Sequence, residues 1–316
     1  MKKLLVIVGP TGTGKTDLAL ELAKKLDGEI VSADSRQIYI GMDVGTGKIP
    51  GNAKLRIKSE ELKKEKGRWI VDGVPIHLYD IITPVKTFSV AAYQQLAYDR
   101  IAEIHKKNKL PILVGGTGLY IRAVVEGLKI PKAAPNKKLR KHLESKPIQS
   151  LIRELEQVDP ETVEKIDKSN QRRVVRALEV YHQTGEPFSK LQGKFKVGFD
   201  ALKIGLTSDR GYLYARVDSR IDTWIKTGFI EEVKILLDKD YKETTALKAL
   251  GYQQISMYLE GKISLEEAIQ RTKFGLHNYI RRQLTWFRKE TGIFWFDIAN
   301  PAFKQQIFNK IQSWLT

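Results

Sequence analysis

Short apolar runs alternate with amphipathic helical patterns in the first third of the chain. Such alternation predicts a parallel sheet wrapped by helices, with ligands at the carboxyl ends of its strands. The stretch from Gly47 to Gly73 is charged and poorly periodic, which indicates a mobile loop or a short hairpin. The expected strands are Leu4–Val8, Glu29–Ala33, Ile76–Ile82 and Ile112–Val114, and the expected helices are Asp17–Lys25 and Val90–Lys107.

The pattern changes from about Tyr120. Up to roughly Phe199 the sequence shows helical patterns, basic residues and five prolines, without a convincing buried strand. Strand character returns at Leu202–Thr207, and long helical patterns then lead to a last apolar run, Ile293–Ile298. We therefore predict an α/β core of residues 1–119 and 201–316, interrupted by an all-helical insertion of residues 120–200.

A complete phosphate-binding loop (P-loop) follows the first expected strand. Its pattern is G-x-x-x-x-G-K-[ST], between a buried strand and a helix, which is the context that this motif requires. Backbone N–H groups would surround a phosphate, Lys15 would add a positive charge, and Thr16 is the expected magnesium ligand. We expect this loop to bind a diphosphate or polyphosphate, and its residues are Gly9, Pro10, Thr11, Gly12, Thr13, Gly14, Lys15 and Thr16.

Composition narrows the class of protein. The 316 residues are 42% hydrophobic and 29% charged and contain no cysteine, which is ordinary for a globular chain and suits the cytoplasm. No apolar run approaches the roughly 20 residues that span a bilayer, so we expect no membrane association. The five histidines show no metal-ligand spacing. We expect a cytoplasmic monomer.

The charge favours a nucleic-acid partner. Lys and Arg number 54 against 37 Asp and Glu, a formal net charge of +17. Scattered surface lysines could account for such a charge, but here the basic residues cluster. Arginines lie among Tyr279, Trp286 and Phe287 near the C-terminus, a mixture typical of single-stranded RNA binding.

Three further features bear on the chemistry. Asp34 lies just past the end of the second expected strand, where it could hold magnesium, accept a proton or simply cap a turn. The strand Ile112–Val114 ends in glycines and Thr117 rather than in the acidic residue of many ATPases, although Asp80 could supply that acid from another strand. Arg216 and Arg220 share a helix face, so that one of them could close over the phosphates.

Seven segments, in this order, resemble the tRNA dimethylallyltransferases, also called tRNA isopentenyltransferases. They are residues 9–16, 32–39, 41–46, 115–120, 172–180, 250–254 and 281–287. The resemblance implies transfer of a dimethylallyl group from dimethylallyl diphosphate to the exocyclic amine of the adenosine beside a tRNA anticodon. It implies Mg²⁺ as cofactor, Lys15, Thr16 and Arg216 at the diphosphate, Asp34 as the base and Thr117 at the target adenosine.

The resemblance also implies a tRNA-binding set, with the insertion holding the anticodon stem-loop. Its members are Asp34, Ser35, Arg36, Gln37, Thr117, Arg140, Arg172, Arg173, Val174, Val175, Arg176, Lys248, Gly251, Tyr252 and Gln253. Two alternatives stay open at this point. One is an enzyme that prenylates free adenine nucleotides, which would have no need of the basic insertion. The other is an RNA-binding protein or small-molecule kinase that binds ATP on the loop.

Overall fold

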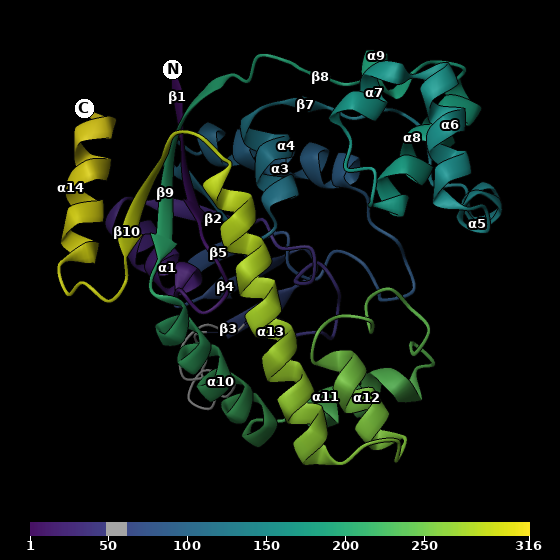
Figure 1. The fold of residues 1–316 in the computed structure, drawn as a ribbon. Coiled ribbons are helices and arrows are strands. Elements are labelled where there is room, and N and C mark those ends of the chain that lie inside the picture. Colours follow the sequence, from purple (N-terminus) through teal and green to yellow (C-terminus); the bar gives the residue numbers. More distant parts are fainter. Residues whose placement is uncertain (49–61) are drawn as a thin grey trace. The chain divides into compact units, whose positions relative to one another are not determined.

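The computed structural model describes residues 1–48 and 62–316. They form two compact units, one of residues 1–124 and 198–316 and the other of residues 125–197 (Figure 1). The predicted boundaries of the insertion fall inside helix α4 (Gly118–Val125) and strand β9 (Phe199–Thr207). Helix α4 lies almost wholly in the first unit because it buries Tyr120, Ile121, Ala123 and Val124 there.

One sheet organises the first unit. Its strand order is β10-β9-β1-β6-β2-β5-β4-β3, with every pair from β10 to β5 parallel. The α/β class is confirmed, but the sheet is not wholly parallel, because β3, β4 and β5 pair antiparallel through short turns. The remaining strands are β1 (Lys2–Val8), β2 (Gly28–Ser32), β3 (Leu62–Glu65), β4 (Arg68–Val71), β5 (Val74–His77), β6 (Leu110–Gly115) and β10 (Ile293–Asp297).

Strand β5 ends earlier than predicted. The apolar run continues to Ile82, but Leu78 and Asp80 have φ angles of 69° and 52°, which extended strands do not adopt. The stretch after Gly47, predicted as a mobile loop or a short hairpin, contains the hairpin β3–β4. Its first strand was not recognisable in the sequence because its residues are charged and mostly exposed. Residues 49–61 of that stretch lie outside the described residues.

Helices cover the sheet and complete its core. Helix α1 and helix α14 pack with the central strands in one hydrophobic cluster, in which Leu5 and Ile7 are fully buried. Burying a large aliphatic side chain stabilises the fold by about 1.5–3 kcal/mol, so these strands hold the loops at their ends firmly. The bounds are α1 (Lys15–Lys25), α3 (Val90–Lys106) and α14 (Phe303–Leu315).

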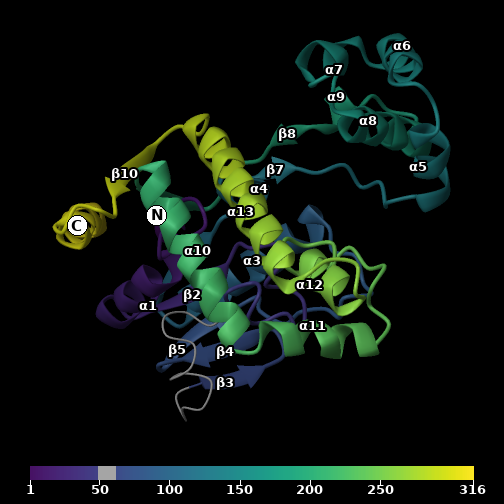
Figure 2. The same cartoon turned by 60° about the horizontal axis from the view of Figure 1, so that its bottom comes forward.

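A second cluster joins the C-terminal helices to the segment after β2. Helices α10 and α13 lie side by side (Figure 1 and Figure 2), and with α11 and α12 they enclose Ile38, Tyr39 and Met42. This packing places a face of α10 beside the P-loop. The bounds are α10 (Arg210–Lys226), α11 (Phe229–Asp238), α12 (Tyr252–Leu259) and α13 (Leu265–Arg288).

The second unit is a small helical bundle with its own core. Leu151, Leu155, Val174 and Leu178 are fully buried in that core. The unit is not all-helical as predicted, because its first and last segments pair as a two-stranded ribbon of two residues each. Its elements are β7 (Leu128–Lys129), α5 (Lys137–Glu144), α6 (Ile148–Val158), α7 (Pro160–Lys165), α8 (Gln171–Thr184), α9 (Phe188–Leu191) and β8 (Gly193–Lys194).

Candidate functional site

The P-loop forms the turn between β1 and α1. Helix α1 begins at Lys15, and Gly14 precedes it with a left-handed φ of 79°. Gly9 is required by close packing as well as by its φ of 142°, since a Cβ there would lie 2.3 Å from the carbonyl oxygen of Leu206. These glycines thus shape the turn by backbone conformation and by lack of a side chain.

Lys15 lies within this turn. Its Nζ donates a hydrogen bond to the carbonyl oxygen of Pro10, at 2.7 Å. Burial, and then the charge of Arg220, lower the pKa of Lys15 to about 7, while Asp34 acts in the opposite direction. An anion bound against Lys15 would favour its charged form and raise that pKa again.

Two arginines of α10 reach the P-loop. Arg216 Nε donates to the carbonyl oxygen of Gly12 at 2.8 Å, and an Arg220 guanidinium nitrogen donates to Thr11 Oγ1 at 2.6 Å. Burial and the neighbouring Arg216 lower the pKa of Arg220 to about 10, so it stays charged at neutral pH. Arg220 thus lies beside Arg216 at the P-loop, and their four-residue spacing on α10 was the signal for it.

These groups line one cavity of about 580 Å³. That volume lies within the range typical of small-molecule sites, about 300–1,000 Å³. The walls come from the P-loop, the ends of β2 and β6, and α10. The lining residues include Thr11, Gly12, Gly14, Lys15, Thr16, Asp34, Gln37, Gly115, Gly116, Arg216, Arg220 and Trp224.

The ends of β2 and β6 bring Asp34 and Thr117 together. Thr117 Oγ1 accepts a hydrogen bond from the backbone N–H of Ser35 at 3.1 Å, directly beside Asp34. Asp34 Oδ1 accepts from the N–H of Arg36 at 2.8 Å, as in an aspartate turn, and among the described residues its Oδ2 has no hydrogen bond. Asp34 therefore both shapes the turn and leaves one carboxylate oxygen for a ligand in the cavity.

Gln283 of α13 also lies at the site, and in the sequence only its place in the segment 281–287 pointed to it. Its side chain is 5% exposed, and it accepts from the N–H of Thr11 at 2.9 Å and donates to the carbonyl oxygen of Gly116 at 3.0 Å. It joins the P-loop to the glycines after β6.

Several predicted residues have structural roles instead. Tyr252 is fully buried, and its hydroxyl donates to Glu232 at 2.6 Å, so its side chain is not available to RNA. Asp80, considered as an acid for magnesium, is paired with the buried Lys48 at 2.5 Å and accepts from Trp69. Gly251 is buried beside Tyr252, whereas Lys248 and Gln253 are exposed.

In the helical unit the predicted arginines fall into two classes. Arg140 and Arg176 form ion pairs with the fully buried Glu179, at 2.8 Å and 2.6 Å. Arg172 and Arg173 are exposed, and neither guanidinium has an ion pair or hydrogen bond within residues 1–48 and 62–316. The neighbouring side chains of Val174 and Val175 are buried in the helical core, because they lie on the opposite face of α8, and so cannot contact RNA.

The cavity offers oxygen donors for a magnesium ion that binds with phosphate. Within the part of the chain that the structure describes, no three His, Cys, Asp or Glu side chains gather as a metal cluster. Mg²⁺ bound with a phosphate needs only one or two protein oxygens, since phosphate and water supply the rest. Thr16 and Asp34 both line the cavity, and this donor set fits such an ion.

Comparison with known proteins decides the family. A model of the IPP transferase family matches residues 37–290. A tRNA dimethylallyltransferase of Geobacillus thermodenitrificans is 42% identical over 306 residues, which cover 95% of this chain and 92% of that protein. The chain belongs to the IPP transferase family. A second relative of this IPP transferase, the tRNA dimethylallyltransferase of Carboxydothermus hydrogenoformans, is 44% identical over 96% of this chain and 94% of its own.

Solved structures agree with this assignment. The full-length tRNA isopentenylpyrophosphate transferase of Bacillus halodurans superposes on the IPP transferase described here with a TM-score of 0.71. The two are 38% identical, over 99% of this chain and 96% of that one. A eukaryotic dimethylallyltransferase, whose crystal structures capture it acting on tRNA, gives a TM-score of 0.77 at 26% identity, over 98% of this chain and 78% of its own.

Proposed function

We propose that this IPP transferase moves the dimethylallyl group of dimethylallyl diphosphate to the exocyclic N6 amine of the adenosine beside the anticodon of tRNA. The observation that carries the proposal is the single cavity in which the P-loop, two arginines and the Asp34 carboxylate meet. Its curated relatives are named tRNA dimethylallyltransferases, and one solved neighbour is a dimethylallyltransferase acting on tRNA. One end of the cavity suits a diphosphate, and the other suits an adenine amine.

The leaving group would bind at the P-loop. As the allylic C–O bond breaks, its electron pair leaves with the diphosphate, and negative charge accumulates there. Backbone N–H groups of residues 11–16 with Lys15, Arg216 and Arg220 would stabilise that charge. Fixed donors of this kind need no rearrangement during the reaction, which makes them effective in catalysis.

The nucleophile would bind beside Asp34 and Thr117. As the N6–C bond forms, the amine loses a proton, and the free Oδ2 of Asp34 is the acceptor that we assign. Thr117, held against Ser35, would contact the target base and align its amine. The reaction then yields prenylated adenosine and diphosphate.

Magnesium is the cofactor that we expect with the diphosphate, and Thr16 would hold it, which leaves the Asp34 carboxylate to act as the base. The chemistry that magnesium supplies is neutralisation of phosphate charge. For the tRNA we propose contacts from Ser35, Arg36, Gln37, Lys248 and Gln253 on the first unit and from the basic helical unit. A tRNA substrate agrees with a cytoplasmic protein, and none of the described helices combines the length and apolar character of a membrane span.

One incubation tests the proposal. The purified protein is mixed with magnesium, labelled dimethylallyl diphosphate and unmodified tRNA, with AMP as acceptor in a parallel reaction. We expect label in tRNA, mapped by nuclease digestion to the adenosine beside the anticodon. Label in AMP alone would assign the enzyme to free nucleotides. Label in neither acceptor, together with tight ATP binding measured by calorimetry, would indicate that the P-loop binds ATP instead.

A further inference from the structure

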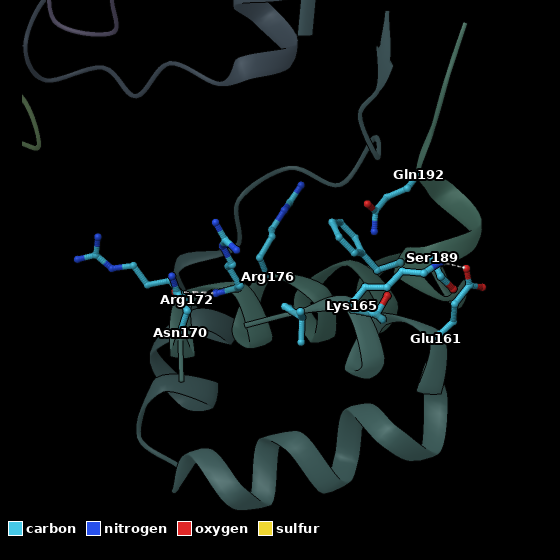
Figure 3. Close-up of a pocket in the computed structure, with 11 residues that line it drawn as sticks. Glu161, Lys165, Asn170, Arg172, Arg176, Ser189 and Gln192 are labelled. Carbon is cyan, nitrogen blue, oxygen red and sulfur yellow. Dashed lines mark hydrogen bonds and ion pairs between the residues drawn. The ribbon is translucent and has the colours of Figure 1, made fainter. Parts of the chain in front are cut away.

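The helical unit contains a second cavity, of about 540 Å³, which none of the residues assigned to the reaction lines. It lies between α8 on one side and α7 and α9 on the other (Figure 3). In Figure 3 Arg172 and Arg176 lie on the α8 side, and Lys165, Ser189 and Gln192 lie on the opposite side. Its volume is ample for one nucleotide by the range typical of ligand sites.

Glu179 fixes the orientation of one cavity arginine. Its carboxylate is fully buried and accepts from Arg140, from Arg176 and from the backbone N–H of Asn136, all at 2.6–2.8 Å. Arg176 also donates to the carbonyl oxygen of Ala133 at 3.0 Å. These bonds fix the Arg176 guanidinium, and Glu179 neutralises its charge. It therefore lines the cavity as a preorganised group rather than as a free charge.

Lys165 and Glu161 of the cavity wall are paired with each other, but three other polar side chains there lack partners among the described residues. The guanidinium groups of Arg172 and Arg173 and the side-chain amide of Gln192 make no hydrogen bond or ion pair within the described ranges 1–48 and 62–316. Phe188 completes the lining and packs against the helical core, so its ring position is fixed. Two free cations, one free amide and one anchored aromatic ring therefore surround the same space.

We propose that this cavity binds one unstacked nucleotide of the RNA substrate, separate from the adenosine that is modified. Arg172 and Arg173 pair with its phosphates, Phe188 stacks on the base, and the Gln192 amide contacts the base edge. Single-stranded RNA is recognised by this combination of stacking, amide contacts and cationic groups. The unit as a whole suits a polyanion, because residues 125–197 contain 16 Lys and Arg against 10 Asp and Glu. The proposal rests on tRNA being the substrate.

Binding of abasic RNAs tests the base contact. The full chain is titrated with a labelled anticodon stem-loop and with a series in which each loop nucleotide in turn lacks its base. We expect one abasic position besides the target adenosine to weaken binding by about 5- to 100-fold, the usual contribution of one stacked base. Phe188→Leu keeps an apolar contact with the core but removes the ring. It should weaken binding of the intact RNA to a similar extent, and removing that base should then weaken binding no further.

Two more variants separate the contact from a folding defect. Gln192→Ala changes an exposed side chain and should remove part of the same base dependence. Arg172→Ala with Arg173→Ala should flatten the salt dependence of binding by about one to two units of slope. Lys141→Ala with Arg153→Ala removes two exposed charges outside the cavity and should leave the abasic profile unchanged.

The outcomes distinguish this proposal from the proposed function. The wild-type protein could prenylate tRNA while Phe188→Leu and each abasic site weaken RNA binding additively. That result would refute the nucleotide cavity and leave the proposed function intact. Wild-type protein that neither binds nor prenylates tRNA refutes both. Free mononucleotides could also compete with the RNA for binding, and Phe188→Leu could abolish that competition. Such a result would assign the cavity to free nucleotides and overturn the RNA assignment.

Discussion

Gln283 and Thr11 are hydrogen-bonded at 2.9 Å although 272 residues separate them in the chain. The same amide donates to Gly116, so one side chain of α13 connects the P-loop to the end of β6. These two segments line the cavity in which we place the diphosphate and the adenosine. Gln283 is therefore a positioning residue for both halves of the proposed reaction.

Gln283→Leu should slow prenyl transfer by about 10- to 100-fold, since small misplacements of reacting groups cost up to about 100-fold in rate. The loss should appear in single-turnover rates, with tRNA affinity unchanged. Gln283→Glu is the matched control, because it keeps the acceptor for the Thr11 N–H and loses the donor to Gly116. A rate equal to wild type in both variants would remove Gln283 from this role.

Asp34→Asn should retain dimethylallyl diphosphate binding and lose about 10²- to 10⁴-fold in single-turnover rate, the usual contribution of a general base. The amide keeps an oxygen that can accept from the Arg36 N–H, so the turn should persist. Binding is measured by calorimetry and the rate by rapid quench. An unaltered rate would show that another group, or water, takes the proton.

Arg220→Met should lower the rate of prenyl transfer by about 10²- to 10³-fold, as loss of one preorganised donor to developing charge commonly does. Arg220 approaches Thr11 at 2.6 Å, and Met keeps much of its packing. Arg210→Met is a suitable control, because this exposed arginine begins the same helix and does not line the cavity. Equal losses in the two variants would contradict a specific role for Arg220.

Glu179→Gln should destabilise the helical unit at neutral pH. Burial alone would raise the pKa of Glu179, but its hydrogen bonds with Arg140 and Arg176 outweigh burial and lower it. A carboxyl whose pKa is lowered by folding stabilises the folded state at pH values above its ordinary pKa of 4.5. This contribution is lost as the pH falls through the folded-state pKa. We expect a loss of about 2 kcal/mol at pH 7, less than for a fully buried pair because both arginines are partly exposed.

Amide hydrogen exchange of α8 measures this stability locally, after correction for the intrinsic effect of pH. The difference in α8 stability between wild type and Glu179→Gln should be largest at pH 7 and shrink below about pH 4.5. Glu186→Gln, at an exposed position in the same unit, should match wild type throughout. A difference that does not depend on pH would mean that Glu179 acts by packing rather than by charge.

The sequence by itself determined the parts of this protein whose conformation depends on residues adjacent in the chain. The P-loop was predictable in full, because its glycines, Lys15 and Thr16 are contiguous and its strand and helix flank it directly. The strands β1, β2 and β6 were recognisable because buried central strands are continuous apolar runs. Strand β3 was not, since an exposed edge strand carries charged residues and no such run.

Only the tertiary structure decided which side chains are free to act. Within one helix, the Arg172 guanidinium has no partner among the residues that the structure describes, while Arg176 is paired with the buried Glu179, and nothing in the local sequence separates them. Tyr252 was a predicted tRNA contact, but its hydroxyl is hydrogen-bonded to Glu232. Gln283 was one polar residue among many in the sequence, but its side chain joins two loops of the site. The physical reason is that burial and pairing depend on elements brought together from distant parts of the chain, which local periodicity does not encode.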